Sequence, residues 1–204
     1  MQDGIRLAGP SRELPLASKL QFIFGGFYAQ FGWAWFGFSS IHLRLFLGLG
    51  AKGLELLPSL ALGCFPFIGL AFIAVGLRKG LRALRLLRNG IYTQGRLVGE
   101  QATAVQINDT TVMAMTFEFK TLDGRSARCV ANTHLVHDLK DDAEEPLVYA
   151  PEDPSVAVLL DELPGKPRIN ADTVVLSREG FVWHLLLLPG ATVLLHLVWT
   201  LSAR

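Results

Sequence analysis

Three long runs of the sequence contain no Asp, Glu, Lys or Arg, and this feature constrains the fold most. The runs cover residues 20–41, 56–77 and 180–203. A helix needs about 20 largely apolar residues to cross ~30 Å of hydrocarbon. Inside a bilayer the backbone must satisfy its own hydrogen bonds, so each run is expected to be a helix. The sequence therefore predicts transmembrane helices at 20–41, within 55–89 and at 180–201.

The composition is consistent with a chain that lies partly in a membrane. Half of the residues (50%) are hydrophobic, and only 18% are charged, against about 25% in average globular chains. The net charge of +1 is a sum over segments of very different charge, so it describes none of them. Cys64 lies in an apolar run and Cys129 in a polar segment, so they are poor partners for a bridge. A chain without a disulfide framework fits a reducing compartment.

Small and polar residues within the runs predict how the helices pack. Membrane helices approach closely where small side chains share a face, although general glycine richness explains the same pattern. We expect the Gln30 amide to bond a neighbouring helix or a carbonyl, and Pro66 and Pro189 to kink their helices. The small residues that share a face are Gly25, Ala29 and Gly32 in the first run, and Gly69, Gly76 and Gly80 in the second.

A basic segment follows the second run and ends at Asn89-Gly90, a helix stop signal. Leucines recur there at helical spacing, so the second helix is expected to continue out of the bilayer as an amphipathic neck. Its cations would meet anionic headgroups of the cytoplasmic leaflet, although an ordinary topology signal without specific lipid recognition is the simpler explanation. The candidate headgroup-contacting residues are Arg78, Lys79, Arg82, Arg85 and Arg88.

The distribution of cations predicts the orientation. Loops rich in Lys and Arg stay in the cytoplasm. This places the amino-terminal tail, 1–19, and everything between Gly90 and Arg178 inside, and Arg204 outside. The expected location is the inner (plasma) membrane of a bacterium, as a multi-pass protein. A cleaved signal peptide fits poorly, because the first run exceeds the ~7–15 residues of a signal core.

Residues 91–165 change from long apolar runs to alternation, which predicts a cytoplasmic β-module. The strands are expected at 95–107, 111–121, 126–132, 146–150 and 155–160. Asp123-Gly124 is a hairpin turn signal. Pro151 and Pro154 cannot donate to a ladder and must lie at strand ends or in a turn. The sequence thus predicts an α-helical membrane part plus a small all-β module, closed or nearly closed into a five-stranded barrel between helices two and three.

The order of these segments resembles the uncharacterised bacterial membrane family called domain of unknown function three-five-nine-two. The likeness covers Thr93–Leu160 and the flanking spans, and it implies architecture without adding chemistry. One departure is the sequence DDAEEPLV before the fourth strand, where the family often has a Gly-x-x-Val turn. The matching residues are Gly95, Leu97, Val98, Phe117, Phe119, Asp123, Gly124, Val148, Tyr149, Pro151, Asp153 and Pro154.

The search for chemistry gives one weak metal candidate. His134 and His137 form a His-x-x-His pair, and Cys129 or Asp138 is a conceivable third ligand. A solvated loop explains the same residues. The sequence lacks a phosphate loop, a G-x-S-x-G and an H-E-x-x-H motif. Acidic residues exceed basic ones between Ile91 and Arg178, which disfavours nucleic acid as a partner.

Three functional hypotheses follow. The first is a non-enzymatic multi-pass membrane protein, without cofactor, whose cytoplasmic β-module binds a protein partner or braces a membrane complex. Self-association through the membrane helices fits the same reading. The second is a subunit of an oligomeric transporter or channel, suggested by Gln30, the prolines and the intramembrane histidines His184 and His196. The third is a metal-dependent membrane hydrolase built on His134, His137 and Cys129.

Overall fold

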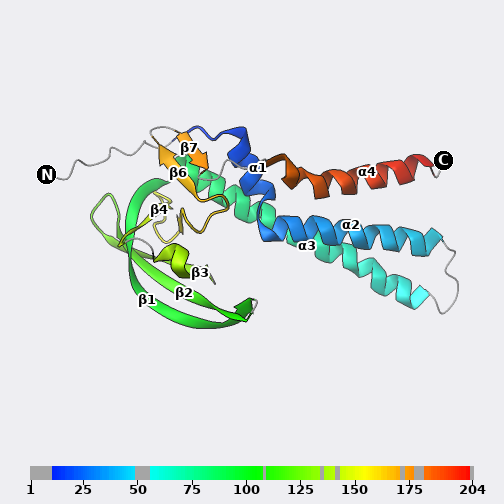
Figure 1. Ribbon diagram of the computed structural model, residues 1–204, viewed down its shortest axis with the longest axis horizontal. Coiled ribbons are helices and arrows are strands. Elements are labelled where there is room, and N and C mark those ends of the chain that lie inside the picture. Colours follow the sequence, from blue (N-terminus) through cyan, green and yellow to red (C-terminus); the bar gives the residue numbers. More distant parts are fainter. Residues whose placement is uncertain are drawn as a thin grey trace. The chain divides into compact units, whose positions relative to one another are not determined.

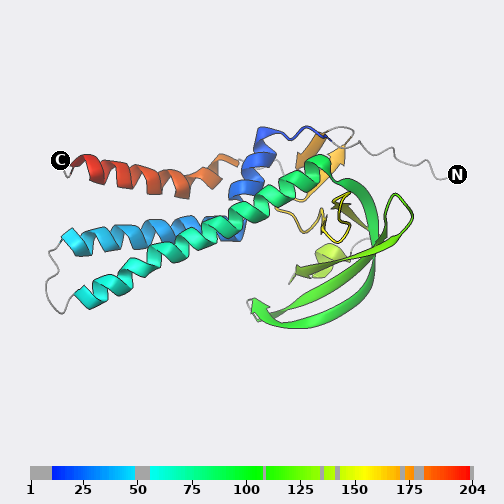
Figure 2. The same ribbon diagram turned by 180° about the vertical axis from the view of Figure 1, so that it is seen from behind.

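The computed structural model describes residues 11–48, 56–107, 109–133, 136–140, 143–170, 173–176 and 182–202. The chain divides into two compact units (Figure 1, Figure 2). The helical unit comprises Leu20–Leu81 and Gly180–Arg204, and the β-unit comprises Met1–Lys19 and Arg82–Glu179. Each is described by itself below.

The first predicted span is two helices instead of one. α1 covers Leu16–Phe24 and α2 covers Phe27–Gly48. The chain bends at Gly25-Gly26, where two residues without side chains make a helix break cheap. The Gln30 side-chain amide donates to the Phe24 carbonyl at 2.7 Å and so satisfies an acceptor that the break leaves open.

The second and third predicted spans are helical. α3 is one helix from Leu56 to Asn89 and passes Pro66 without ending. The last run begins as a 3-10 turn, η3 (Val182–Leu186), and continues as α4 (Leu187–Ser202), with Pro189 in its first turn. Residues 180–181 and 203 of this run lie outside the described part of the chain.

By length and composition, two described helical segments could cross a membrane, Gly63–Asn89 and Val182–Ser202. α2 is not one of them, although it has 22 residues; its sequence contains the polar residues Gln30, His42 and Arg44. Composition therefore supports two candidate spans rather than the three predicted.

α2 and α3 pack closely through small residues. A Cβ atom added to Gly69 would lie 2.6 Å from the backbone nitrogen of Phe36, and one added to Gly76 would lie 2.7 Å from that of Ala29. A Cβ on Gly32 would meet the backbone nitrogen of Ile73 at 2.6 Å. The predicted small-residue faces therefore meet each other, and backbone rather than side chain occupies the contact.

Aromatic rings line the same α2–α3 contact. Phe31 meets Phe72 with ring centroids 4.8 Å apart, and Tyr28 stacks on Phe72 at 6.0 Å. The Trp35 indole nitrogen donates to the Phe65 carbonyl at 3.0 Å, next to Pro66. Edge-to-face and offset ring pairs of this kind add to the packing of the two helices.

The β-unit contains an antiparallel five-stranded sheet in the order β3-β2-β1-β4-β5. The strands are β1 (Ile91–Ile107), β2 (Thr110–Lys120), β3 (Ser126–Thr133), β4 (Glu145–Tyr149) and β5 (Ala157–Leu159). β1 pairs with β4 through Ile91–Gly95 and with β2 from Gly95 onward. Two register shifts bend β1, which curves along β2 in both views (Figure 1, Figure 2).

The alternation predicted for the strands matches their burial. Met115 and Phe117 are fully buried, while Val130 faces out beside buried Cys129. Gly95 lies where β1 passes between its two partners, and a Cβ there would lie 2.6 Å from Leu147 Cδ2. Leu139, on the 3-10 turn η2 (Val136–Leu139), is also buried in the core. The core of the sheet is Met115, Phe117, Phe119, Cys129, Ala131, Leu139, Leu147, Tyr149 and Leu159.

The predicted barrel is wrong, because the sheet does not close. β3 and β5 are its two edges, and they contact each other without forming a ladder. β5 has only three residues, and the preceding corner contains Pro151 and Pro154, which lack backbone donors. An edge this short offers too few hydrogen bonds to complete a barrel.

The carboxyl end of α3 is capped from the amino-terminal segment. The buried Arg12 guanidinium donates to the carbonyls of Leu87 (3.0 Å) and Gly90 (2.7 Å). The backbone nitrogens of Ser11 and Arg12 both donate to the Arg88 carbonyl at 2.9 Å. A helix end leaves carbonyls without partners, and a cation there also complements the helix dipole. Residues 11–12 are thus part of the β-unit and not a free tail.

A second small sheet was not predicted. β6 (Pro167–Asn170) and β7 (Thr173–Leu176) form a hairpin. The Arg168 guanidinium bonds Asp161 at 2.8 Å, and the Asp161 side chain is only 7% exposed. The backbone nitrogen of Val174 donates to the Glu13 carbonyl at 3.4 Å. The hairpin therefore links the amino-terminal segment to the chain that follows β5.

The glycine contacts predict the effect of added side chains in α3. We expect Gly76→Val to lower the thermal unfolding temperature of the detergent-solubilised chain, because its branched side chain would overlap the Ala29 backbone. Overpacking of this kind typically costs about 1–3 kcal/mol. Gly63→Val is the matched control, since nothing lies within 4 Å of a Cβ at Gly63 in the same helix. Equal unfolding temperatures for the two variants would contradict the packing described.

Candidate functional site

The outward surface of the helical unit is strongly apolar. In the apolar 18-residue stretch of each candidate span, only 17% is buried within the chain for Val182–Ser202 and 28% for Gly63–Asn89. Soluble proteins seldom expose contiguous apolar surface of this kind, whereas lipid-facing helices do. The exposed large apolar residues of α4 are Leu187, Leu188, Val193, Leu194, Leu195, Leu197, Val198, Trp199 and Leu201, and those of α3 up to Val75 are Phe65, Phe67, Ile68, Leu70 and Val75.

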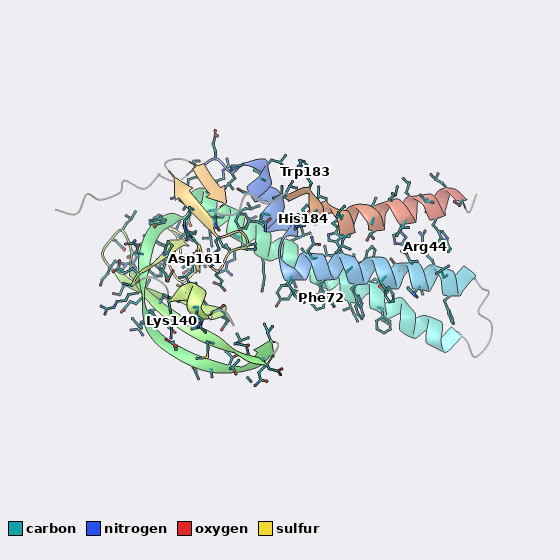
Figure 3. The ribbon with its side chains drawn as sticks, viewed as in Figure 1. Arg44, Phe72, Lys140, Asp161, Trp183 and His184 are labelled. Atoms are coloured by element: carbon teal, nitrogen blue, oxygen red, sulfur yellow. The ribbon has the colours of Figure 1, made fainter. Side chains whose placement is uncertain are left out.

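Amphipathic residues frame this apolar surface at both ends of the helical unit. At one end lie Tyr28 of α2, Lys79 of α3 and Trp183 of η3, and at the other lie Arg44 of α2 and Trp199 of α4. Figure 3 shows Trp183 and Arg44 toward opposite ends of the unit. Tyr28 to Arg44 and Trp183 to Trp199 are each about 24 Å apart along a helix. These end groups are called the two belts below.

Contacts between helices hold each belt at one level. The Lys79 ammonium lies 4.1 Å from the centroid of the Tyr28 ring, a cation–π contact. At the other end the Arg44 guanidinium donates to the Thr200 hydroxyl at 3.4 Å. A belt spacing of about 24 Å is somewhat below the ~30 Å of a hydrocarbon core, a mismatch that snorkelling and local thinning absorb.

A line of polar groups, the polar seam, joins α2 to the η3–α4 segment. It consists of Gln30, Ser40 and Arg44 on α2, and the Leu185 carbonyl, His196 and Thr200 opposite them. Between these pairs, a Cβ added to Gly37 would lie 2.5 Å from the Thr192 hydroxyl. From one pair to the next, the residue numbers rise on both helices, so α2 and α4 run parallel.

The hydrogen bonds of the seam give partners to polar groups that would have none in an apolar solvent. Gln30 donates to the Leu185 carbonyl at 2.9 Å as well as to Phe24, as predicted for its amide. The Ser40 hydroxyl donates to the Phe36 carbonyl at 2.5 Å, so its oxygen is left to accept from His196 Nε2 at 2.8 Å. This use of the polar side chains favours helix packing over a transport path.

The five predicted headgroup-contacting cations form the basic stripe. Arg78, Lys79, Arg82, Arg85 and Arg88 are all exposed on α3. The opposite side of the helix is buried at Gly76, Gly80, Ala83 and Leu87. This buried line differs from the predicted leucine face, since Leu81 is 47% exposed. Small side chains, rather than leucines alone, therefore form the packed face of the neck.

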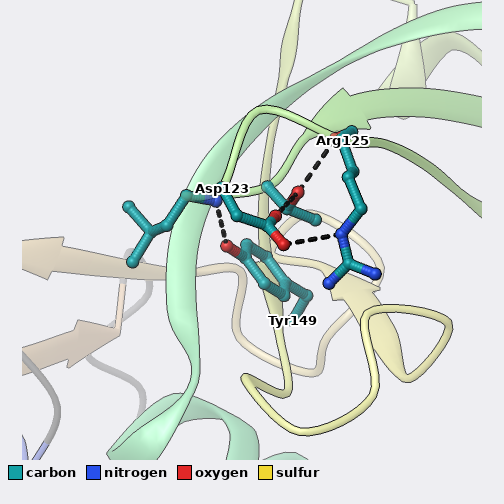
Figure 4. A network of polar contacts seen from close by, with 5 residues as sticks. Asp123, Arg125 and Tyr149 are labelled. Carbon is teal, nitrogen blue, oxygen red and sulfur yellow. Dashed lines mark hydrogen bonds and ion pairs between the residues drawn. The ribbon is translucent and has the colours of Figure 1, made fainter.

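The β2–β3 hairpin turn is rigid and structural (Figure 4). Gly124 has φ +79°, the left-handed region that this turn requires. The Thr121 hydroxyl and the Arg125 guanidinium both bond the Asp123 carboxylate, and the Thr121 bond is the larger cause that lowers the pKa of Asp123. The Tyr149 hydroxyl accepts from the Leu122 backbone nitrogen at 2.9 Å. Tyr149 thereby ties the turn to β4.

The proline corner between β4 and β5 is likewise a turn and not a site. The backbone nitrogen of Val156 donates to the Asp153 carbonyl at 2.9 Å, and the Asp153 carboxylate accepts from the Ser155 backbone nitrogen at 3.0 Å. Pro154 lies within this turn and Pro151 precedes it, both outside the strands, as predicted.

The metal candidates are not brought together as a site in the described residues. His137 is exposed on η2, whereas Cys129 belongs to the core of the sheet. Burial, and to a smaller extent the charge of Glu162, raises the pKa of the Cys129 thiol to about 11. A thiol held protonated is a poor metal ligand. His134 and the Asp138 side chain lie outside the described part, and no group of three potential ligands occurs within it.

The outer face of the sheet carries a small apolar patch. Val98 of β1 is 47% exposed and Val130 of β3 is 59% exposed. Thr116, which pairs with Val130, separates them on β2. The next row along the sheet contains Glu118 and Arg128, whose charged groups lie 3.6 Å apart. An apolar centre beside charged residues is the usual composition of a protein-binding surface.

Sequence reasoning predicted the Gln30 contact but missed the rest of the seam and the arginine cap. Thr192, His196 and Thr200 recur every four residues in an otherwise apolar helix. That spacing puts all three on one face and could have signalled a contact with another helix. Arg12 gave no such signal, because its carbonyl partners are about 75 residues away in the sequence.

The seam predicts an energetic coupling between Ser40 and His196. In a double-mutant cycle of Ser40→Ala and His196→Ala, we expect a coupling of about 0.6 kcal/mol, the typical value for a hydrogen bond between membrane helices. Unfolding in detergent provides the measurement. Ser39→Ala with His196→Ala is the control pair, since the Ser39 hydroxyl bonds the Trp35 carbonyl of its own helix. Coupling of equal size in both cycles would contradict the assigned contact.

Comparison of the chain with protein-family models, curated proteins and solved structures finds no match. The resemblance to the uncharacterised membrane family therefore stays a prediction.

Proposed function

We propose that the chain is a multi-pass membrane protein whose β-unit serves as a protein-interaction or scaffolding module at the membrane surface. The observation that carries this proposal is the bare apolar surface of α4 between the two belts. In water this surface would drive aggregation, whereas in lipid it needs no further partner. Two helices that merely pass a composition test would be weak support, but most of their surface is uncovered, unlike that of a core helix.

The proposal includes α2 as a third spanning helix. α2 has 22 residues, a length of about 33 Å. Its polar side chains Gln30, Ser40 and Arg44 are engaged in the seam. Polar residues within membrane helices characteristically face another helix and bond to it. The contacts of α2 with the η3–α4 segment therefore support a membrane-spanning α2, although its composition alone does not.

Three spans place the β-unit on one side of the membrane. α2 and α4 run parallel and α3 runs against them, so the amino-terminal segment, the end of α3 and the start of η3 leave the helical unit at the same end. The basic stripe lies at that end, and the positive-inside rule makes it cytoplasmic. The proposed location is the inner (plasma) membrane of a bacterium, with the carboxyl terminus outside.

The scaffolding role rests on the outer face of the sheet. The interior of the sheet is filled by its own core, while Val98 and Val130 stay exposed on the other face. No enzymatic role is proposed.

If the outer face of the sheet binds a partner protein, negative charge added to that face should weaken the binding. We expect Val98→Glu with Val130→Glu to remove specific proteins from the set cross-linked to the full chain in native membranes. Two buried or partly buried carboxylates at an interface without partners would oppose association. The matched control is Gln106→Glu with Ser126→Glu, which adds the same charge to the same two exposed strands. Identical cross-linked sets for wild type and the Val98/Val130 variant would contradict a scaffolding role for this face.

A further inference from the structure

We infer that the first part of the basic stripe, Arg78 and Arg82, binds the anionic headgroups of phospholipids, and that Arg85 and Arg88 stand beyond the headgroup layer. This inference rests on the proposed membrane embedding of the helical unit. It adds a class of ligand, an anionic phospholipid, and divides the stripe into residues that touch it and residues that do not.

The first step is the continuity of α3. The helix runs from Leu56 to Asn89 without interruption, so axial distances along it follow from residue spacing. Exposed large apolar side chains dominate α3 up to Val75, the first exposed cation is Arg78, and beyond it Leu81 is also exposed, at 47%. The change from apolar to cationic surface therefore occurs within about 5 Å along the axis. A surface that is mainly apolar before this point and mainly cationic after it matches the boundary between hydrocarbon and headgroups.

The second step places this boundary independently. Lys79 lies over the ring of Tyr28, and Tyr28 belongs to the same belt as Trp183. Tyrosine and tryptophan concentrate at the headgroup level of membranes. Two helices and η3 thus mark the same level, next to Arg78. Lys79 already contacts an aromatic face there, which leaves the arginines as the cations open to lipid.

The third step is the depth of the headgroup layer. Each leaflet contributes about 5–8 Å of headgroup region outside the hydrocarbon. Arg82 lies one turn, about 6 Å, beyond Arg78, whereas Arg85 and Arg88 lie about 10 and 15 Å beyond it. Arg78 and Arg82 are four residues apart and share one face of α3, opposite the buried line at Gly80 and Ala83. The geometry gives one headgroup two guanidinium partners.

The fourth step is charge. In the described part of the chain, no ion pair joins a carboxylate to Arg78, Arg82, Arg85 or Arg88. Guanidinium groups bind phosphate oxygens in a bidentate manner. A cation near an anionic leaflet strengthens association about five-fold, or about 1 kcal/mol. Anionic phospholipid is therefore the complementary occupant of this face.

The test uses the full chain reconstituted in vesicles of phosphatidylcholine with a minor fraction of phosphatidylglycerol. Spin-labelled phosphatidylglycerol and phosphatidylcholine report the relative association of each lipid with the protein. We expect wild type to select phosphatidylglycerol several-fold, and 1 M salt to weaken the selection. Arg78→Gln with Arg82→Gln should remove most of it, while Arg85→Gln with Arg88→Gln should retain most of it.

The control variant is Arg96→Gln with Arg128→Gln, which removes two exposed arginines from the β-sheet and should leave lipid selection unchanged. Equal selection by wild type and the Arg78/Arg82 variant would overturn the inference, as would equal losses in the two stripe variants. Extraction at alkaline pH separates this failure from failure of the proposed function. A chain that stays in the membrane but selects no anionic lipid contradicts only the inference, whereas a chain released into the supernatant contradicts both.

Discussion

The close approach of α2 to α3 is the contact on which the arrangement of the helical unit depends. Gly69 and Gly76 allow backbone to meet backbone, and the ring contacts around Phe72 follow from that spacing. Because α2 is fixed on α3, its opposite side can present Gln30, Ser40 and Arg44 to η3 and α4. A second consequence is the alignment of Tyr28 with Lys79 at one level of the unit.

In the proposed arrangement α3 passes from lipid into water as one helix. Its first part presents bare apolar side chains, and its last turns present arginines outward and Ala83 and Leu87 inward. The helix ends in a polar cap, where the Arg12 guanidinium and two backbone nitrogens satisfy its last carbonyls. β1 starts at Ile91, immediately after this cap. The sheet is thus joined to a helix end that is fixed by hydrogen bonds, which suits the proposed scaffolding role.

Local pattern was enough to predict the strands and the long helix, because each depends on residues near one another in the sequence. The alternation around Phe117 and the Asp123-Gly124 turn are examples. Three features were wrong or missed, and two of them, the barrel and the arginine cap, depend on partners distant in sequence. The barrel failed because closure depends on the lengths of both edge strands. The glycine break before α2 is stabilised by Gln30, and the arginine cap joins residue 12 to α3.

The central claim is that lipid surrounds α4 between the belts. Nitroxide labels at Leu188, Leu194 and Leu201, in a chain with Cys64→Ser, measure this directly through collision with oxygen and with a water-soluble nickel chelate in reconstituted vesicles. All three leucines are exposed. The account predicts that Leu194 shows the highest oxygen access and the lowest nickel access, with the opposite trend toward both belts. Nickel access at Leu194 as high as at a label on exposed Lys140 of the β-unit would contradict it.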